Sequence, residues 1–300
     1  MAVIPKAAPA APTRHRSGAK RWKTAKRTIV ILVLVACSVV FLYPLAWLVA
    51  ASLKTQGTVF NNSLIPNPVM WSNYVEVWKQ LPLWHWLFNS VSIAVLAAVF
   101  VAVSSSMVAW GFAHFRFPFR NALFSLVLAT MMLPGAVTMV PTYLIWKYIG
   151  VLGTWVPLFG GNLFGSAFYI FLQRQFYLGL PRDIFEAARV DGANQWSIFW
   201  RLVMPLSLPS FIIVCLFEFQ ASWNNLQGGL IYLNAGTPPS FTAPLGIAYA
   251  MTKYSPTGGG QPNYQYVMVA ALIVTLPMLL LFSFGQRYFI EGVATTGRKG

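Results

Sequence analysis

The chain has 300 residues, of which 57% are hydrophobic and only 9% are charged. A soluble domain usually has about 25% charged residues, so this composition excludes an ordinary soluble protein and favours an integral membrane protein. The formal net charge is +15, but the basic residues lie between long apolar runs, which indicates orientation beside anionic lipid and not binding to nucleic acid.

The N-terminal 27 residues contain eight basic and no acidic side chains and are rich in alanine and proline. Residues 1–27 are therefore predicted to form a basic, disordered cytoplasmic tail. The apolar segment that follows is too long for the core of a signal peptide, and no A-x-A site follows it. It is expected to stay in place as a membrane anchor.

Six apolar stretches are long enough to be membrane-spanning helices, which need about 20 largely apolar residues. They lie within Thr28–Leu53, near Leu87–Phe112, between Arg120 and Lys147, between Lys147 and Arg174, over Leu206–Leu230 and over Tyr266–Phe289. We therefore predict an all-α integral membrane protein. Residues 28–290 would form about six transmembrane helices, and residues 291–300 a C-terminal cytoplasmic tail.

The third and fourth predicted helices contain residues that interrupt helices. The third has Pro134, Gly135 and Pro141, and the fourth has three glycines, of which Gly165 is the last. In lipid, such breaks survive only where neighbouring protein or a wet cavity satisfies the backbone. They indicate either a lined pathway or close helix packing through small residues.

The basic residues predict the orientation of the chain. With the N-terminus inside, 17 basic residues fall in inside segments and four in outside segments. Because inside loops carry an excess of lysine and arginine, both termini are expected to be cytoplasmic.

The inside loop over residues 181–205, here called the coupling loop, holds three of the six acidic residues of the chain. Asp183 and Glu186 have the spacing of a capping box. Four residues are predicted to share one helical face: Ile184, Ala187, Ala188 and Asp191. Gly192 permits a reversal, after which a second amphipathic stretch, Trp196–Val203, ends at Pro205.

The coupling loop resembles the signature of binding-protein-dependent ABC importer permeases. The matching residues are Glu186-Ala187-Ala188, Gly192, Leu202 and Pro205. Asn89-Ser90 and Trp223-Asn224 extend the likeness to the carbohydrate branch, which includes the maltose-permease G subunit. Asn225 stands where that branch usually has an aspartate.

The resemblance implies a subunit in the inner membrane of a prokaryotic cell, with a set of partners. These are a homologous second permease, two ATPase subunits, an extracytoplasmic sugar-binding protein, membrane lipid and a carbohydrate substrate. The residues implied to couple to the ATPase are Glu186, Ala187, Ala188, Asp191 and Gly192. The chain lacks G-x-x-x-x-G-K-[ST], so we expect no cofactor on it and ATP on the partner.

Two polar stripes are candidates for the substrate path. On the fifth predicted helix Glu218, Ser222 and Asn225 are spaced i, i+4, i+7. On the fourth, the spacing is i, i+4, i+7, i+11, for Asn162, Ser166, Tyr169 and Gln173. Each stripe should share one helix face that avoids lipid. The stripes would either line a sugar path or make interhelical hydrogen bonds.

Two other classes of function are alternatives to the importer. A membrane-embedded enzyme would need a catalytic motif, but H-E-x-x-H and G-x-S-x-G are absent. The three histidines (His15, His85 and His114) do not cluster with carboxylates in the sequence, so neither catalytic nor metal-binding residues are predicted. An ion-coupled secondary transporter would need ionisable groups inside the membrane, and Glu218 is the one candidate.

Overall fold

The computed structural model describes residues 16–233, 236–255 and 262–296, and all regular structure in these ranges is helical. The helices are α1 (Arg16–Ser52), α2 (Asn73–Gln80), α3 (Leu83–His114), α4 (Arg120–Thr130), α5 (Gly135–Ile149), α6 (Val156–Phe159), the 3₁₀ turn η1 (Gly160–Phe164), α7 (Ala167–Leu178), α8 (Arg182–Val190), α9 (Gln195–Ile198), the π-helical turn η2 (Phe199–Val203), α10 (Met204–Leu206), α11 (Leu208–Trp223), α12 (Leu226–Tyr232), the 3₁₀ turn η3 (Pro238–Ser240), α13 (Ala243–Lys253) and α14 (Tyr264–Thr296).

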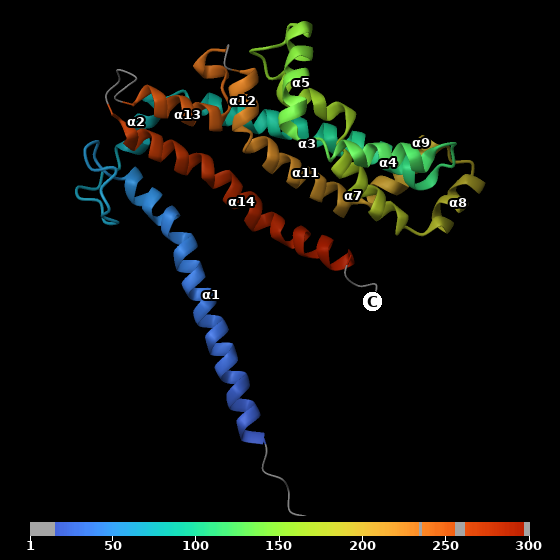
Figure 1. Ribbon diagram of the computed structural model, residues 1–300, viewed down its shortest axis with the longest axis horizontal. Helices are drawn as coiled ribbons and strands as arrows, with labels where there is room; N and C mark the ends of the chain where they lie inside the picture. The colour runs from blue at the N-terminus through green and yellow to red at the C-terminus, as the bar shows by residue number, and fades with distance from the viewer. Residues whose placement is uncertain (1–15, 234–235, 256–261, 297–300) are drawn as a thin grey trace, which may run out of the picture.

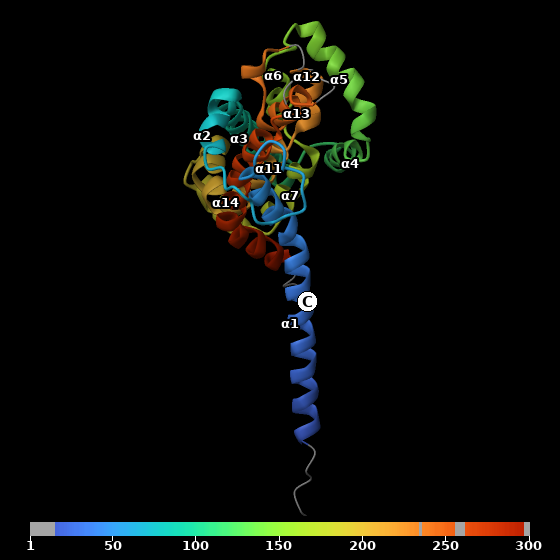
Figure 2. The ribbon, with the colours of Figure 1, turned by 90° about the vertical axis from the view of Figure 1, so that its left-hand side faces the viewer.

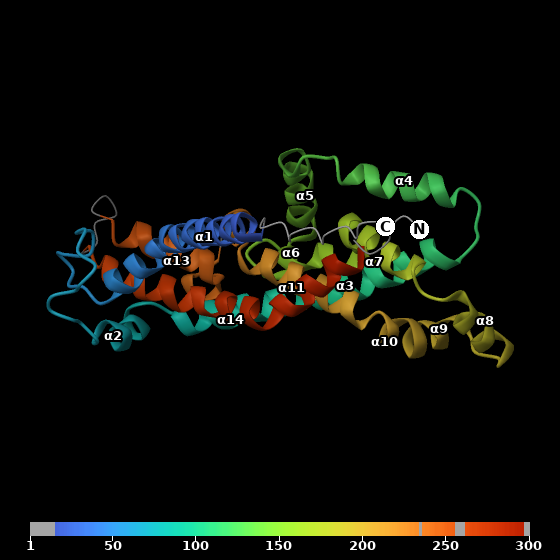
Figure 3. The same cartoon turned by 90° about the horizontal axis from the view of Figure 1, so that it is seen from below.

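Helix α3 runs the length of the bundle and packs mainly against α7 and α11 (Figure 1). Its buried residues are mostly small, and they include Ala94, Ala97, Ala102, Ser105 and Ala109. Small side chains let helix backbones approach closely, which gives strong dispersion contact inside a membrane. Seen from below, α2 lies at one end of this bundle and α8 at the other (Figure 3).

Hydrogen bonds tie the segment before α13 to the α2 end of α3. The Trp86 indole donates to the Pro238 carbonyl at 2.7 Å, and the Asn89 amide donates to the Phe241 carbonyl at 2.9 Å. Gly246 of α13 lies so close to Trp86 that a Cβ there would overlap the indole. These contacts hold a long connection rigidly against the bundle.

Helix α1 projects away from the rest of the protein (Figures 1 and 2). It begins at Arg16, so the prediction of a disordered tail over residues 1–27 is wrong for residues 16–27. Alanine, lysine and arginine are good helix formers, and they extend the apolar helix backwards. Residues 1–15 lie outside the described part of the chain.

At the other terminus, α14 continues to Thr296. The predicted tail over residues 291–300 is therefore helical over its first six residues, for the same reason of continuity with a long apolar helix. Residues 297–300 lie outside the described ranges.

The apolar stretches form fewer continuous spans than the predicted six. Within the described residues, three helices are long and apolar enough to cross a membrane: Lys26–Ser52, Leu83–His114 and Tyr264–Gln286. The count rises to five if two bent pairs each make one span, namely α4 with α5 (95°) and Gln195–Leu206 with α11 (77°).

The break in the third predicted helix covers residues 131–134 and ends with Pro134, because the residue preceding a proline is biased away from helix. The fourth predicted helix is divided by η1 and by Gly165, whose φ is +80°. It is not among the candidate spans. The fifth ends early at Trp223, and α12 starts afresh at Leu226.

Candidate functional site

Glu218 is half-buried in α11 and links several elements. Its carboxylate accepts a hydrogen bond from the Asn162 amide at 2.5 Å, and the Tyr169 hydroxyl also bonds to it. The Asn162 amide donates in addition to the Ala97 carbonyl of α3 at 3.3 Å. Hydrogen bonds to an ionised group are about twice as strong as neutral ones, so Glu218 can hold α3, η1 and α7 together around itself.

A run of three serines in α3 meets the polar residues that precede and form α7. Ser104 donates to the Asn162 carbonyl at 3.0 Å, and Ser105 accepts from the Ser166 backbone at 3.1 Å. Gln173 donates to Ser106 at 2.7 Å and has no exposed surface. Ser166 and Gln173 therefore act as interhelical contacts in this conformation. Sequence reasoning missed these serines, although Ser104-Ser105-Ser106 is a polar run in an apolar helix.

The prediction that each polar stripe lies on one helix is wrong. Asn162 belongs to η1 and Ser166 precedes α7, while only Tyr169 and Gln173 lie on α7 itself. Asn225 likewise lies beyond the end of α11 and caps α12 by accepting from the Gly228 backbone at 2.8 Å. Gly165 and the Asn224-Asn225 pair break the helical period, because both sites depart from helical backbone.

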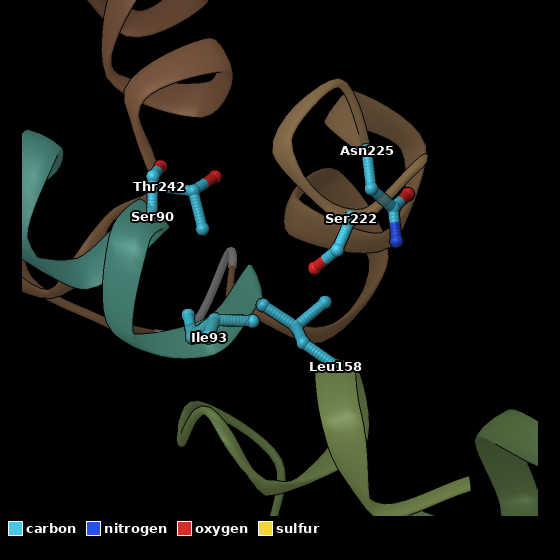
Figure 4. Close-up of a pocket in the computed structure, with 6 residues that line it drawn as sticks. All are labelled: Ser90, Ile93, Leu158, Ser222, Asn225 and Thr242. Carbon is cyan, nitrogen blue, oxygen red and sulfur yellow. The ribbon is translucent and has the colours of Figure 1, made fainter. Parts of the chain in front are cut away.

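Ser222 and Asn225 nevertheless come together at a small recess between α3, α11 and α13 (Figure 4). Ser90 and Thr242 lie opposite, with Ile93 and Leu158 between. Ser90 accepts from the Ala243 backbone at 2.7 Å, while the buried Thr242 hydroxyl has no hydrogen-bond partner in the structure. Hydroxyl and amide groups from segments far apart in the sequence thus meet at one point between the helices.

The coupling loop folds as predicted into a helix, a turn and a second helix, and Phe185 anchors it. Phe185 is only 1% exposed and packs edge-on against Trp110, with ring centroids 5.0 Å apart. Phe199 and Val203 of η2 complete this cluster. Phe185 was not among the predicted site residues, because the expected apolar face of α8 was the one containing Ile184, which is exposed.

The other residues of α8 are mostly open to solvent. Glu186, Ala187 and Asp191 are exposed, Ala188 is half-buried, and Val190 is 88% exposed. Gly192 has φ +81° and no atom near the place of a Cβ. The glycine is therefore required for its backbone conformation and not for space inside this chain.

The predicted capping box is wrong. Helix α8 starts after Pro181, which makes no side-chain cap, and Asp183 lies in the first turn. Proline is favoured at the start of a helix because its fixed φ suits the first turn, and this moves Asp183 inside the helix. The cap in the coupling loop is Asn194, whose side chain accepts from the Ser197 backbone at 2.8 Å and starts α9.

The coupling loop leads without a flexible linker into the helix that carries Glu218. From α9 the chain passes through η2 and α10 into α11 at Ser207, whose side chain is buried and donates to the Val203 carbonyl at 2.6 Å. Consecutive helical segments therefore join the second half of the coupling loop to α11, with a bend of 77° between them.

The chain is similar in sequence to permease subunits of known transport systems. The family model described as "Binding-protein-dependent transport system inner membrane component" matches residues 103–295. The chain is 31% identical to the arabinooligosaccharides transport system permease protein AraQ of Bacillus subtilis, over 91% of this chain and 96% of that protein. It is 29% identical to the lactose transport system permease protein LacG of Rhizobium radiobacter, over 84% and 89%.

A solved structure shares the fold. It is a bacterial ABC transporter involved in the import of the acidic polysaccharide alginate, and one of its chains superposes with a TM-score of 0.74 at 20% identity. The match covers 92% of this chain and all of that one.

Proposed function

The chain belongs to the family of inner-membrane components of binding-protein-dependent transport systems, and from this premise we propose that it is the permease subunit of an ATP-driven importer for a sugar or oligosaccharide. It is a multi-pass protein of the inner membrane and a transport subunit, not an enzyme. Relatives named for arabinooligosaccharides and lactose support the substrate class.

The observation that carries this proposal is the construction of α8. Phe185 fixes the helix to the bundle core, while Ile184, Ala187 and Asp191 remain exposed on its far side. A short stiff helix with small exposed residues can enter a groove on a partner and transmit its motion. That partner is an ATPase subunit, which binds the ATP that this chain has no motif to bind.

Helices α1, α4 and α5 support a second, homologous permease as the neighbour of this chain. The apolar window of the α1 span is unburied, and no residue of α4 or α5 is buried. Partner helices and lipid together would cover these faces. The complete importer would contain two permeases, two ATPase subunits and an extracytoplasmic binding protein that delivers the sugar.

The substrate path runs past Glu218, Tyr169 and the recess at Ser222. Carboxylate and amide groups pair with sugar hydroxyls, and aromatic rings stack on sugar faces. In this conformation Glu218 and Asn162 are hydrogen-bonded to each other. A substrate hydroxyl would replace Asn162 as the partner of Glu218 when the path opens. Asn225 and Thr242 line the same route nearer the α2 end.

An ion-coupled secondary transporter that uses Glu218 is the alternative. The partners of Glu218, Asn162 and Tyr169, are uncharged at neutral pH, whereas proton relays in transporters use chains of ionisable groups. The two mechanisms differ in their energy source. Uptake that stops when proton and sodium gradients collapse, in vesicles supplied with ATP, would favour the alternative.

The assembly itself is tested by purification and reconstitution. A tagged chain is expected to copurify with a second permease and two ATPase subunits, and the chain alone should neither hydrolyse ATP nor accumulate sugar. The measurement is sugar uptake into proteoliposomes with ATP inside, with and without the partners. Robust uptake by the chain alone would contradict the proposed function.

The proposed orientation puts both termini and the coupling loop in the cytoplasm. Reporter fusions after Met70 and after Val190 should then report opposite sides of the membrane, because α2 and α8 lie at opposite ends of the bundle (Figure 3). The check is alkaline phosphatase activity against fluorescence of a cytoplasmic reporter. The same side for both fusions would refute this topology.

A further inference from the structure

A second polar feature lies at the α8 end of the bundle, away from Glu218. A cavity of about 690 Å³ opens between the end of α3, the start of α4 and α8. Four arginines line it: Arg116, Arg120, Arg182 and Arg189. We call this feature the arginine cleft.

The charge of the arginine cleft is not balanced by the chain. Glu186 is the one acidic residue in its lining. Within the described ranges the only ion pair is Lys79 with Glu76, which lies at the α2 end. None of the four guanidinium groups therefore has a described carboxylate within 4 Å. Three of the four arginines are exposed, so water screens their mutual repulsion, and a bound anion would lower this repulsion further.

The four arginines line the cleft from two separate elements. Arg182 and Arg189 are seven residues apart and so lie on the same face of α8, about 10 Å apart along it. Arg116 and Arg120 approach from the connection between α3 and α4, and Arg120 is held by donating to the Phe115 carbonyl at 3.3 Å. Guanidinium forks from two elements suit the oxygens of a phosphate, which accept paired hydrogen bonds.

The same connection exposes apolar side chains beside the arginines. Phe119 is 80% exposed, and it is the one described non-glycine residue with a positive φ, at +60°. Phe115 and Phe117 are also exposed. A strained, exposed aromatic next to basic residues is expected where a chain meets the membrane interface, with rings toward the acyl chains and arginines toward the headgroups.

We propose that the arginine cleft binds a phosphate-bearing anion, and that the exposed phenylalanines select an anionic phospholipid headgroup as its source. The inference rests on the proposed function, because that assignment places the cleft at the cytoplasmic leaflet. A lipid bound there would join α8, the helix proposed to meet the ATPase, to the membrane surface.

The test uses the complete importer in nanodiscs of phosphatidylcholine alone or mixed with phosphatidylglycerol, and counts bound phosphatidylglycerol by native mass spectrometry. Two variants lower the charge of the cleft: Arg116→Gln with Arg120→Gln, and Arg189→Gln alone. Arg201→Gln is the matched control, since Arg201 is exposed in the coupling loop but does not line the cleft. We expect binding to weaken about fivefold for each arginine removed from the cleft and to stay unchanged in the control.

A second arm adds glycerol phosphate to wild-type importer. Displacement of phosphatidylglycerol by it would support the phosphate site, whereas binding of glycerol phosphate to an importer that binds no phosphatidylglycerol would overturn the lipid as its source. Equal lipid binding by the wild type and both cleft variants in the first arm would overturn the proposal. Loss of the ATPase subunits from the cleft variants, with lipid retained, would also overturn it and make the cleft a protein contact. Lipid counts do not depend on transport, so failure here is distinguishable from failure of the proposed function.

Discussion

Replacing Gly192 with leucine is expected to lower ATP-driven sugar uptake by at least about tenfold while the chain still inserts in the membrane. Gly192 has φ +81°, where a residue with a Cβ costs roughly 1–2 kcal/mol. The turn must therefore either change its backbone conformation, which would move Asp191 relative to α9, or keep its conformation. In the second case the leucine side chain would project where the ATPase approaches. No atom lies near its Cβ position, so the bundle itself should tolerate the change.

Two controls separate backbone strain from the loss of docking. Gly150 has φ +82° with equally open space and caps α5 away from α8, so Gly150→Leu carries the same local strain and should retain most uptake. Gly192→Asn keeps the left-handed backbone at little cost and should be milder than leucine. The measurements are uptake, ATP hydrolysis and copurification of the ATPase. Full uptake by Gly192→Leu with the ATPase stably bound would exclude a coupling role for this turn.

Glu218→Gln is expected to lower uptake of the native sugar about tenfold or more, with the importer still assembled. The variant keeps the shape of the side chain but replaces a charge-assisted hydrogen bond from Asn162 by a neutral one. Loss of the charge weakens every hydrogen bond that residue 218 can accept from a substrate hydroxyl. The measurement is the initial rate of uptake against sugar concentration in proteoliposomes, together with ATP hydrolysis.

Glu76→Gln provides the matched control, because Glu76 pairs with Lys79 on the exposed surface of α2. An exposed ion pair contributes little, about 0–1 kcal/mol, so this variant should transport normally. Unchanged uptake kinetics in Glu218→Gln would mean that the hydrogen bonds of Glu218 only hold the helices together and that Glu218 does not contact the substrate. If ionophores leave wild-type uptake unchanged and the Glu218→Gln variant has lost uptake, Glu218 lies in the substrate path and does not couple an ion.

Hydropathy and charge predicted the helical class and the membrane location, and the resemblance of residues 181–205 to a known signature identified the coupling loop. The loop was recognisable because its chemistry is local: Glu186, Ala187 and Gly192 lie within one turn-forming segment of a mostly apolar chain. The choice of buried face on α8 was not local. Both faces of this short helix carry apolar side chains, so periodicity could not decide between Ile184 and Phe185.

The extent of the helices and the partners of the polar residues were decided by tertiary structure. Pro134 and Gly165 could have kinked a helix or broken it, and the outcome depends on whether neighbouring segments satisfy the freed backbone groups. The pairing of Gln173 with Ser106 and of Asn162 with Glu218 joins residues more than fifty positions apart. A sequence displays the periodicity of each helix, but the choice of which helix faces meet follows from the packing of the whole bundle, where most buried polar groups find a partner.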